Sequence, residues 1–403
     1  MAVTDAPSPG FRLSMLINDS RYRGYTFQTI AFIALMCLAA VMVMNAAANL
    51  ERLGKDISFD FLWQGASYDI YPKLIPFEST DTHFRAAMVG VLNTLLVAFF
   101  GCIAATVIGV VAGVLRLSNN WLIAKVMAVY VEIFRNVPVL LWILLIMQIV
   151  AISFNNPMAY RGDEPEATML WGSFAFTTLG IYTPAPTWNA GSGIVVGVFI
   201  LSLAAMWFYS RHRKKVLFET GRMLPGFPVM LGLFFVPALL AFFIMGRPIG
   251  LDYPSMGGFT FSGGMLIGGP FIALWLALSL YTGAFIAENV RAGILAISKG
   301  QSEAASALGL RPNRTMSLVI LPQALRVIIP PVISQYLNLT KNSSLAAFIG
   351  YQEITGTLMG ITLNQTGRSF EAVLLGMLIY LLISLLISFL GNLYNSSVRL
   401  KER

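Results

Sequence analysis

The sequence predicts an all-α membrane protein with eight transmembrane helices. Of its 403 residues, 57% are apolar and only 11% are charged, whereas roughly 25% of the residues of a soluble domain are charged. A helix that crosses a bilayer needs about 20 mostly apolar residues. Runs of this kind occupy residues 26–48, 86–115, 121–154, 191–210, 226–245, 266–290, 327–350 and 370–395.

The positions of the basic residues predict the orientation of these helices. When the spans alternate, Lys and Arg accumulate on the side that carries both termini, and Asp and Glu accumulate on the other side. A dense basic run, Arg211, Arg213, Lys214 and Lys215, directly follows the fourth span. Basic residues concentrate on the cytoplasmic side of membrane proteins, so we expect both termini in the cytoplasm. The net charge of +8 then reflects topology and not binding of nucleic acid.

The N-terminal part, residues 1–85, is expected to hold a cytoplasmic N-terminus, an anchor helix and an outer segment. A polar leader of about 25 residues and an apolar run of about 20 are both too long for a cleaved signal peptide. The following residues 49–85 include Trp63, Tyr68 and Tyr71 among acidic residues. Aromatic residues concentrate at the membrane–water interface, so we expect this segment to lie along the outer interface. A second outer segment, residues 155–190, is expected to be a solvated loop.

Two signals predict how the next spans pack. In the span 86–115, small residues recur at every fourth position: Gly101, Ala105, Gly109 and Gly113. This spacing lines one helix face and predicts close contact with another helix. A straight helix over residues 121–154 would be about 51 Å long at 1.5 Å per residue, but the apolar core of a bilayer is only about 30 Å thick. We therefore expect this helix to tilt strongly or to break near Pro138.

The motifs of common enzymes are missing from the sequence. It contains no Walker A, HExxH, CxxC or GxSxG pattern, and its only histidines, His83 and His212, fall on opposite sides of the predicted membrane. An acid–base or metal-dependent enzyme is therefore disfavoured, and we predict no catalytic or metal-binding residues. Ionisable and amide groups at membrane depth are costly and usually mark a transport pathway. Transport is the function class that the sequence favours.

The cytoplasmic loop after Glu288 has a distinctive spacing. It reads Glu303-Ala304-Ala305, three residues, Gly309, nine residues and then Val-Ile-Leu-Pro at 319–322. Ser302 is a suitable cap for a short helix that ends at Gly309, and Pro312 is a suitable start for a second one. Two short helices would form a compact projection, with Arg311 and Arg314 able to bind a partner or an anionic lipid.

This spacing resembles the EAA loop of ABC importer permeases, whose pattern is EAA, three residues, Gly, nine residues and I-x-L-P. The sequence departs only at Val319, where the family has Ile. In that family the loop is the coupling helix that docks in a cleft of a cytoplasmic ATPase subunit. The resemblance implies this role for the loop at 303–322, carried by Glu303, Ala304, Ala305 and Gly309, with Arg311 beside them. It also implies that ATP and Mg bind to the partner ATPase and that this chain holds no cofactor.

Further segments resemble the polar amino acid branch of these permeases: Val131–Pro138, Ala287–Ile294, Leu321–Arg326 and Lys341–Leu345. The resemblance implies a five-helix permease core made of residues 86–154 and 266–403, with a two-helix insert in residues 155–265 and the anchor helix before it. This long form is similar to the larger permease subunit of general L-amino acid uptake systems of Gram-negative bacteria. The branch usually has Gly-Thr-Pro where this chain has Asn136-Val137-Pro138, so a role that needs the Thr hydroxyl is not expected.

The family implies a set of partners for this chain in the bacterial inner membrane. These are a second permease subunit, two copies of the ATPase, a periplasmic amino acid binding protein and the membrane lipids. The implied function is ATP-driven import of L-amino acids by alternating access. Two alternatives remain open: a secondary transporter that uses Glu132, Glu288 and Lys341 as an ion relay, and an accessory scaffold without a pathway.

The span 327–350 contains the predicted substrate pathway. If it is helical after Pro330 and Pro331, then Gln335, Asn338 and Asn342 fall within about 60° of one another. Amides suit a zwitterionic amino acid because they donate to its carboxylate and accept from its ammonium group. Lys341 points elsewhere and is expected to pair with Glu132 or Glu288, or to meet the substrate carboxylate. Hydrogen bonding between helices is the alternative role for this set, which also includes Ser343.

Two other charged residues lie near the spans. Arg135 precedes Pro138 closely and is a candidate either for substrate contact or for an ion pair with Glu288. Glu353 lies near the outer end of its span, and we expect it to be solvated.

Overall fold

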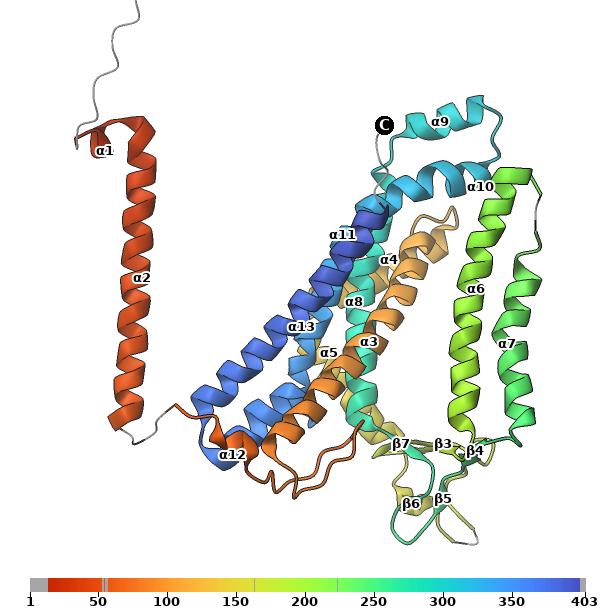
Figure 1. Ribbon diagram of the computed structural model, residues 1–403, viewed down its shortest axis with the longest axis horizontal. Helices are drawn as coiled ribbons and strands as arrows, with labels where there is room; N and C mark the ends of the chain where they lie inside the picture. The colour runs from red at the N-terminus through yellow and green to blue at the C-terminus, as the bar shows by residue number, and fades with distance from the viewer. Residues whose placement is uncertain (1–13, 53, 55–56, 163, 223, 399–403) are drawn as a thin grey trace, which may run out of the picture. The chain divides into compact units, whose positions relative to one another are not determined.

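The computed structural model describes residues 14–52, 54, 57–162, 164–222 and 224–398 and is mostly helical (Figure 1). The chain divides into two compact units, Met1–Phe61 and Leu62–Arg403. The first unit contains α1 (Met15–Asn18) and α2 (Ser20–Arg52), and the predicted anchor run lies within α2. The predicted cytoplasmic termini lie partly outside the described residues.

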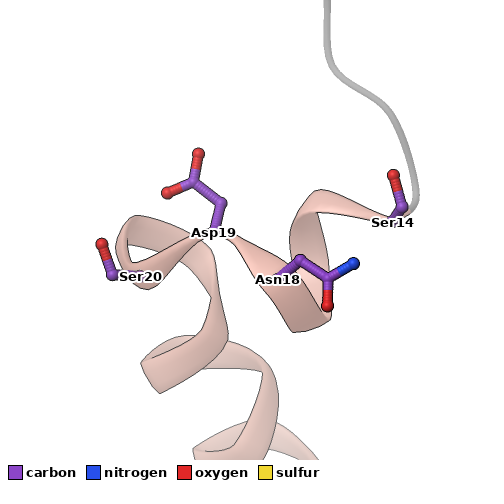
Figure 2. A pocket seen from close by; sticks show the side chains of 4 residues that line it. All are labelled: Ser14, Asn18, Asp19 and Ser20. Carbon is purple, nitrogen blue, oxygen red and sulfur yellow. The ribbon is translucent and has the colours of Figure 1, made fainter.

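The beginning of α2 is set by a polar cap. The backbone N–H of Arg21 donates to the Asp19 carboxylate over 2.9 Å, and the N–H of Arg23 donates to the Asp19 carbonyl. Figure 2 shows the small depression between α1 and α2, which is lined by Ser14, Asn18, Asp19 and Ser20. Because its carboxylate serves the helix end, we interpret this depression as a helix cap and not as a binding site.

The predicted membrane spans agree with the helices of the described residues. Seven helices are long and apolar enough to cross a membrane, and one bent pair makes an eighth span if its two helices cross together. The seven are Ser20–Asn49, His83–Leu115, Ser192–Leu217, Phe227–Ile244, Gly269–Leu295, Pro312–Ile349 and Ser369–Ser396. The pair, α4 (Trp121–Asn136) and α5 (Val139–Ser153), is bent by 107°. The expected break near Pro138 is confirmed: Val137 is extended, and Pro138 precedes the first residue of α5.

The centre of the second unit is formed by α3 (His83–Leu115) and α8 (Gly269–Leu295), which run side by side in the same direction (Figure 1). A Cβ atom at Gly109 would lie 2.6 Å from Ile286, and one at Gly113 would lie 2.6 Å from the carbonyl oxygen of Ala287. The close contact predicted from the small residues of α3 is therefore confirmed. Such spacing lets two backbones approach where no side chain would fit.

The helices after α8 are α9 (Lys299–Ala307), α10 (Pro312–Thr315), the π-helix η3 (Met316–Ile320), α11 (Leu321–Asn342), the 3-10 helix η4 (Ser343–Ile349), the π-helix η5 (Thr355–Thr362), α12 (Leu363–Thr366) and α13 (Ser369–Val398). Of these helices, α11, η4 and η5 pack against the pair of α3 and α8. Pro330 and Pro331 lie inside α11 and do not begin it. Tyr336 of α11 shares a 2.7 Å hydrogen bond with Thr106 of α3, which ties α11 to the central pair.

The insert contains a helical hairpin and several short strands. Helices α6 (Ser192–Thr220) and α7 (Phe227–Ile244) pack on each other, with the rings of Phe199 and Phe234 5.2 Å apart. The antiparallel sheets are β1-β2-β7 (Ala175–Thr177, Gly180–Thr183, Met265–Gly268), β3-β4 (Ala185–Trp188, Ile249–Asp252) and β5-β6 (Ser255–Met256, Phe261–Ser262).

The expectation of a plain solvated loop at residues 155–190 is wrong. This segment contains the 3-10 helix η2 (Pro157–Tyr160) and three strands, and Tyr182 and Ala175 are buried with Phe261 from the segment between α7 and α8. Two segments that are far apart in the sequence therefore share one small apolar core. Residues 62–82, which begin within the 3-10 helix η1 (Asp60–Trp63), also pack inward: Ile70 and Phe77 are buried against Val89 of α3.

Candidate functional site

The projection predicted after α8 consists of α9, a turn at Gly309 and α10. Helix α9 begins at Lys299 after Ser298, so the expected cap at Ser302 is wrong, because Ser302 lies inside the helix. Gly309 ends α9 with a φ of +76°, a conformation that glycine adopts without strain. Pro312 begins α10 as predicted.

This projection presents an exposed surface on a buried base. Glu303, Ala304, Gly309 and Arg311 are exposed, whereas Ala305 is buried. Leu308, at the tip, is 82% exposed. A single exposed apolar side chain is common on protein surfaces, so Leu308 alone does not define a binding surface.

A compact ionic cluster lies where α3 and α8 approach this projection. Glu288 of α8 accepts hydrogen bonds from Arg116, directly after α3, and from Arg291, whose Nη2 lies 2.6 Å away. Arg135 of α4 lies 3.9 Å from the same carboxylate and 5.2 Å above the ring of Phe285. One carboxylate thus joins three helices at this end, and three guanidinium groups surround it.

The predicted pathway residues of α11 lie at different depths in the protein. Asn338 and Lys341 are exposed, Gln335 and Asn342 are half-buried, and Ser343 is buried with its hydroxyl bonded to the carbonyl of Thr340. Among the described residues no carboxylate lies within 4.0 Å of Lys341. The expected alternative of a pair with Glu132 or Glu288 is therefore not seen in this conformation.

Lys341 instead lines a cavity of about 640 Å³, which we name the Lys341 cavity. Ligand pockets in proteins commonly have volumes of roughly 300–1,000 Å³. Its walls come from the end of α11, η4, η5 and α13, and they combine a charged group and hydroxyls with apolar side chains. The lining residues are Lys341, Ser344, Leu345, Phe348, Thr355, Met359, Met377, Tyr380, Leu381 and Ser384.

A buried carboxylate stands directly behind the wall of the Lys341 cavity. The expectation that Glu353 is solvated is wrong, because its exposed fraction is 0%. Its Oε1 accepts from the backbone N–H groups of Thr355 (2.8 Å) and Gly356 (3.1 Å). Its Oε2 accepts from the hydroxyl of Tyr380 over 2.5 Å, and the hydroxyl of Thr94 lies 3.3 Å away. Buried charges require this kind of full hydrogen bonding.

The two residues before Glu353 connect the same turn to other elements. The Tyr351 hydroxyl donates to the carbonyl of Asn93 in α3 over 3.2 Å. Gln352 accepts from the backbone N–H of Tyr71 over 2.7 Å and donates to the carbonyl of Asp69. The turn therefore links α3, the segment before α3 and the wall of the Lys341 cavity.

Sequence reasoning missed Glu353 and Tyr380 as site residues. Glu353 follows an apolar run and precedes a stretch rich in Gly and Thr, a pattern that also fits an exposed loop. A carboxylate between two apolar runs was the only available signal, since the distance from Glu353 to Tyr380 depends on the tertiary fold.

The chain is similar in sequence to known transport permeases. A family model described as binding-protein-dependent transport system inner membrane component matches residues 193–400. The glutamate/glutamine/aspartate/asparagine transport system permease protein BztB of Rhodobacter capsulatus is 51% identical over 99% of both chains. The general L-amino acid transport system permease protein AapQ of Rhizobium johnstonii is 40% identical over 98% of this chain and 96% of its own. The crystal structure of an amino acid ABC transporter with histidines aligns with a TM-score of 0.45 and 20% identity over 78% of this chain and 95% of that chain.

Proposed function

The chain belongs to the binding-protein-dependent inner membrane components of ABC transporters, as a permease subunit of an amino acid importer, and we propose that it forms one half of the translocation pathway for L-amino acids. The observation that carries this proposal is the identity of 51% over 99% of both chains with a permease named for glutamate, glutamine, aspartate and asparagine. The relatives are permease components and not enzymes, so covalent chemistry is assigned to a partner.

The projection from α9 to α10 is the proposed contact with a cytoplasmic ATPase. Its exposed residues are Glu303, Ala304 and Leu308. They form a small surface with one apolar side chain, and we propose that it inserts into a groove of the ATPase. Helices α10, η3 and α11 follow one another directly, so a movement of the projection is passed along α11 to Lys341. ATP and Mg bind to the ATPase, and the resulting movement makes this chain alternate between two orientations.

A second permease is the proposed cover of the exposed face of α11. Ser334, Asn338 and Lys341 are exposed within this apolar span. Polar and charged groups are expensive against lipid, so this face requires protein or a water-filled path. Two related subunits that face each other through α11 and α13 would enclose such a path between them.

The Lys341 cavity is the proposed substrate site of this subunit. The ammonium of Lys341 donates hydrogen bonds and suits a carboxylate, whereas the hydroxyls of the lining suit a zwitterion. The amides of Asn338 and Asn342 lie on the same helix outside the lining of the cavity, and we propose that they contact the substrate along the path. Arg135 and Glu288 are proposed to serve the cytoplasmic end of the path, where their ion pair also joins α4 to α8. A periplasmic binding protein would deliver the amino acid at the opposite, outer face.

The proposed location is the bacterial inner membrane with both termini in the cytoplasm. This orientation follows from the basic residues after the fourth span, which the positive-inside rule assigns to the cytoplasm. It also puts the α9–α10 projection on the side where ATP is available.

Uptake in vesicles tests the proposal. The permease pair, its ATPase and the binding protein are reconstituted with ATP inside, and entry of radiolabelled L-glutamate and L-glutamine is measured. We expect uptake only with ATP and all components present. Uptake driven by an ion gradient without the ATPase would instead support the alternative of a secondary transporter that uses Glu132, Glu288 and Lys341.

A further inference from the structure

We propose that Glu353 is a positioning residue that fixes the hydroxyl of Tyr380 as a hydrogen-bond acceptor in the Lys341 cavity, where it receives the α-ammonium group of the substrate. This inference rests on the proposed function, because it assumes that the Lys341 cavity holds the transported amino acid. It adds a chemical selection for a free α-ammonium group to that function.

The first step is the direction of the hydrogen bond between Glu353 and Tyr380. The backbone N–H groups of Thr355 and Gly356 can only donate, and both point at Oε1 of Glu353. Oε2 accepts from Tyr380, whose hydroxyl lies 2.5 Å away, and the hydroxyl of Thr94 makes a longer contact with it at 3.3 Å. A carboxylate only accepts, so the single hydrogen of the Tyr380 hydroxyl is directed toward Glu353.

The second step concerns what remains available on the cavity side. A phenol oxygen that has donated its hydrogen keeps lone pairs and can only accept. Two further hydroxyls lie near that of Tyr380. The Thr355 hydroxyl is 3.5 Å away, which is much longer than the bond to Glu353, and the Ser343 hydroxyl already donates its hydrogen to the carbonyl of Thr340. The oxygen of Tyr380 therefore presents acceptor capacity to the same cavity into which Lys341 brings three donor hydrogens.

The third step matches these two groups to a ligand. An α-amino acid carries a carboxylate, which suits Lys341, and an ammonium group, which suits an oxygen that only accepts. The hydroxyl of Ser384 adapts to either group, that of Ser344 donates to the carbonyl of Lys341 and can accept, and the apolar side chains of Leu345 and Met377 surround the rest. A carboxylic acid without the α-ammonium would satisfy Lys341 but would offer no donor to the oxygen of Tyr380, which would keep its bond to Glu353 on the other side.

The substitution Glu353→Gln should reverse the direction of the hydrogen bond between residue 353 and Tyr380 without changing the size of the side chain. The backbone N–H groups of Thr355 and Gly356 would still require an oxygen, so the carbonyl of the introduced amide would face them and its NH₂ would face Tyr380. The hydroxyl of Tyr380 would then accept from the amide and turn its own hydrogen toward the cavity, where it would oppose an ammonium group.

The test is binding of two probes to the intact complex of permeases and ATPases in lipid nanodiscs without the binding protein. The probes are L-glutamine and glutaramate, which is glutamine without the α-ammonium group, and their Kd values are measured by equilibrium dialysis. We expect the wild type to prefer glutamine at least about tenfold, since hydrogen bonds to charged groups have this magnitude. In Tyr380→Phe and Glu353→Gln this preference should fall to nearly one, while the Kd for glutaramate stays within about twofold.

Tyr351→Phe is the matched control, because it removes a hydroxyl from the same turn that bonds Asn93 and does not line the cavity. It should keep the wild-type preference. A wild-type preference in Glu353→Gln, or an equal loss in Tyr351→Phe, would overturn the positioning role. Binding of both probes with equal affinity by the wild type would overturn the role of Glu353 and Tyr380 in recognising the ammonium group, but not the cavity as the substrate site. No binding of glutamine by the assembled wild type would overturn the cavity as substrate site as well.

Discussion

Gly109 of α3 lies against Ile286 of α8 so closely that a Cβ atom at position 109 would come within 2.6 Å of the Ile286 Cβ and within 2.8 Å of the Gly283 carbonyl. Both atoms belong to the backbone of α8 or are attached directly to it, so neither can move without moving α8. The two central helices therefore depend on the absence of a side chain at this position. The sequence signal for this contact was the spacing of small residues, which does not reveal which helix is the partner.

We predict that Gly109→Ala destabilises the protein by roughly 1–3 kcal/mol, the range for overpacked sites in a core. The measurement is the thermal midpoint of the purified complex by size-exclusion chromatography after heating. Gly197→Ala in α6 is the matched control, because no atom lies within 4 Å of its added Cβ. It should be neutral or slightly stabilising, since Ala is a better helix former than Gly. Equal midpoints for both variants would contradict the close packing of α3 on α8.

Much of this fold could be predicted because its strongest signals are local. Apolar runs determine the spans, and Pro138 determines the break between α4 and α5. The strands around Tyr182 and Phe261 could not be predicted, because their burial depends on two segments about 80 residues apart meeting in space. The start of α9 at Lys299 was also missed, since several serines in that segment can cap a helix equally well.

The ionic cluster at Glu288 gives a second prediction. Glu288→Gln removes the carboxylate that Arg116 and Arg291 share, and it leaves partly buried guanidinium groups facing one another. We expect a loss of stability of up to about 3 kcal/mol, together with reduced assembly. Glu132→Gln is the control, because Glu132 is exposed and bonds only within its own helix, to Asn136. The measurement is the thermal midpoint of each complex, and we expect it to fall for Glu288→Gln and not for Glu132→Gln. An unchanged midpoint for Glu288→Gln would contradict the structural role of the cluster.

The conformation of Gly309 gives a third prediction. At a φ of +76° a β-branched residue is strained by roughly 1–2 kcal/mol, so Gly309→Val should displace the end of α9. We expect ATP hydrolysis to continue while uptake falls, measured as ATP consumed per molecule imported. Gly309→Asn is the control, because no atom lies near an added Cβ at this position and Asn tolerates this conformation. It should keep uptake coupled to ATP hydrolysis. Full coupling in Gly309→Val would argue against docking through this turn.

A fourth prediction concerns the charge on the same projection. Glu303 is exposed on α9, so Glu303→Lys should leave the thermal midpoint unchanged while it lowers uptake at least about tenfold, the effect expected from opposing charges in a specific interface. Glu219→Lys, a charge reversal at an exposed site in α6, should keep normal uptake. If both variants transport normally, Glu303 does not face the ATPase.

The candidate site was less predictable than the fold. The resemblance of the sequence to a family directed attention to α11, and Lys341 does line a cavity there. Glu353 and Tyr380 are 27 positions apart, and their hydrogen bond exists only because α13 folds back on η5. A single sequence reports which residues are polar but not which of them tertiary packing will bury.

The last prediction separates a transport pathway from an accessory scaffold. Lys341→Ala and Asn338→Leu change exposed residues of α11, so the fold should tolerate them, whereas a site that uses their donors should not. We expect uptake to fall at least about tenfold, which corresponds to the loss of one hydrogen bond to a charged group, with normal assembly by size exclusion. Lys125→Ala in α4 removes an exposed cation away from the Lys341 cavity and should retain uptake. Normal uptake by both α11 variants would mean that the path lies in the partner subunit, because a carboxylate that depended on Lys341 could not bind once its only cation in the cavity had been removed.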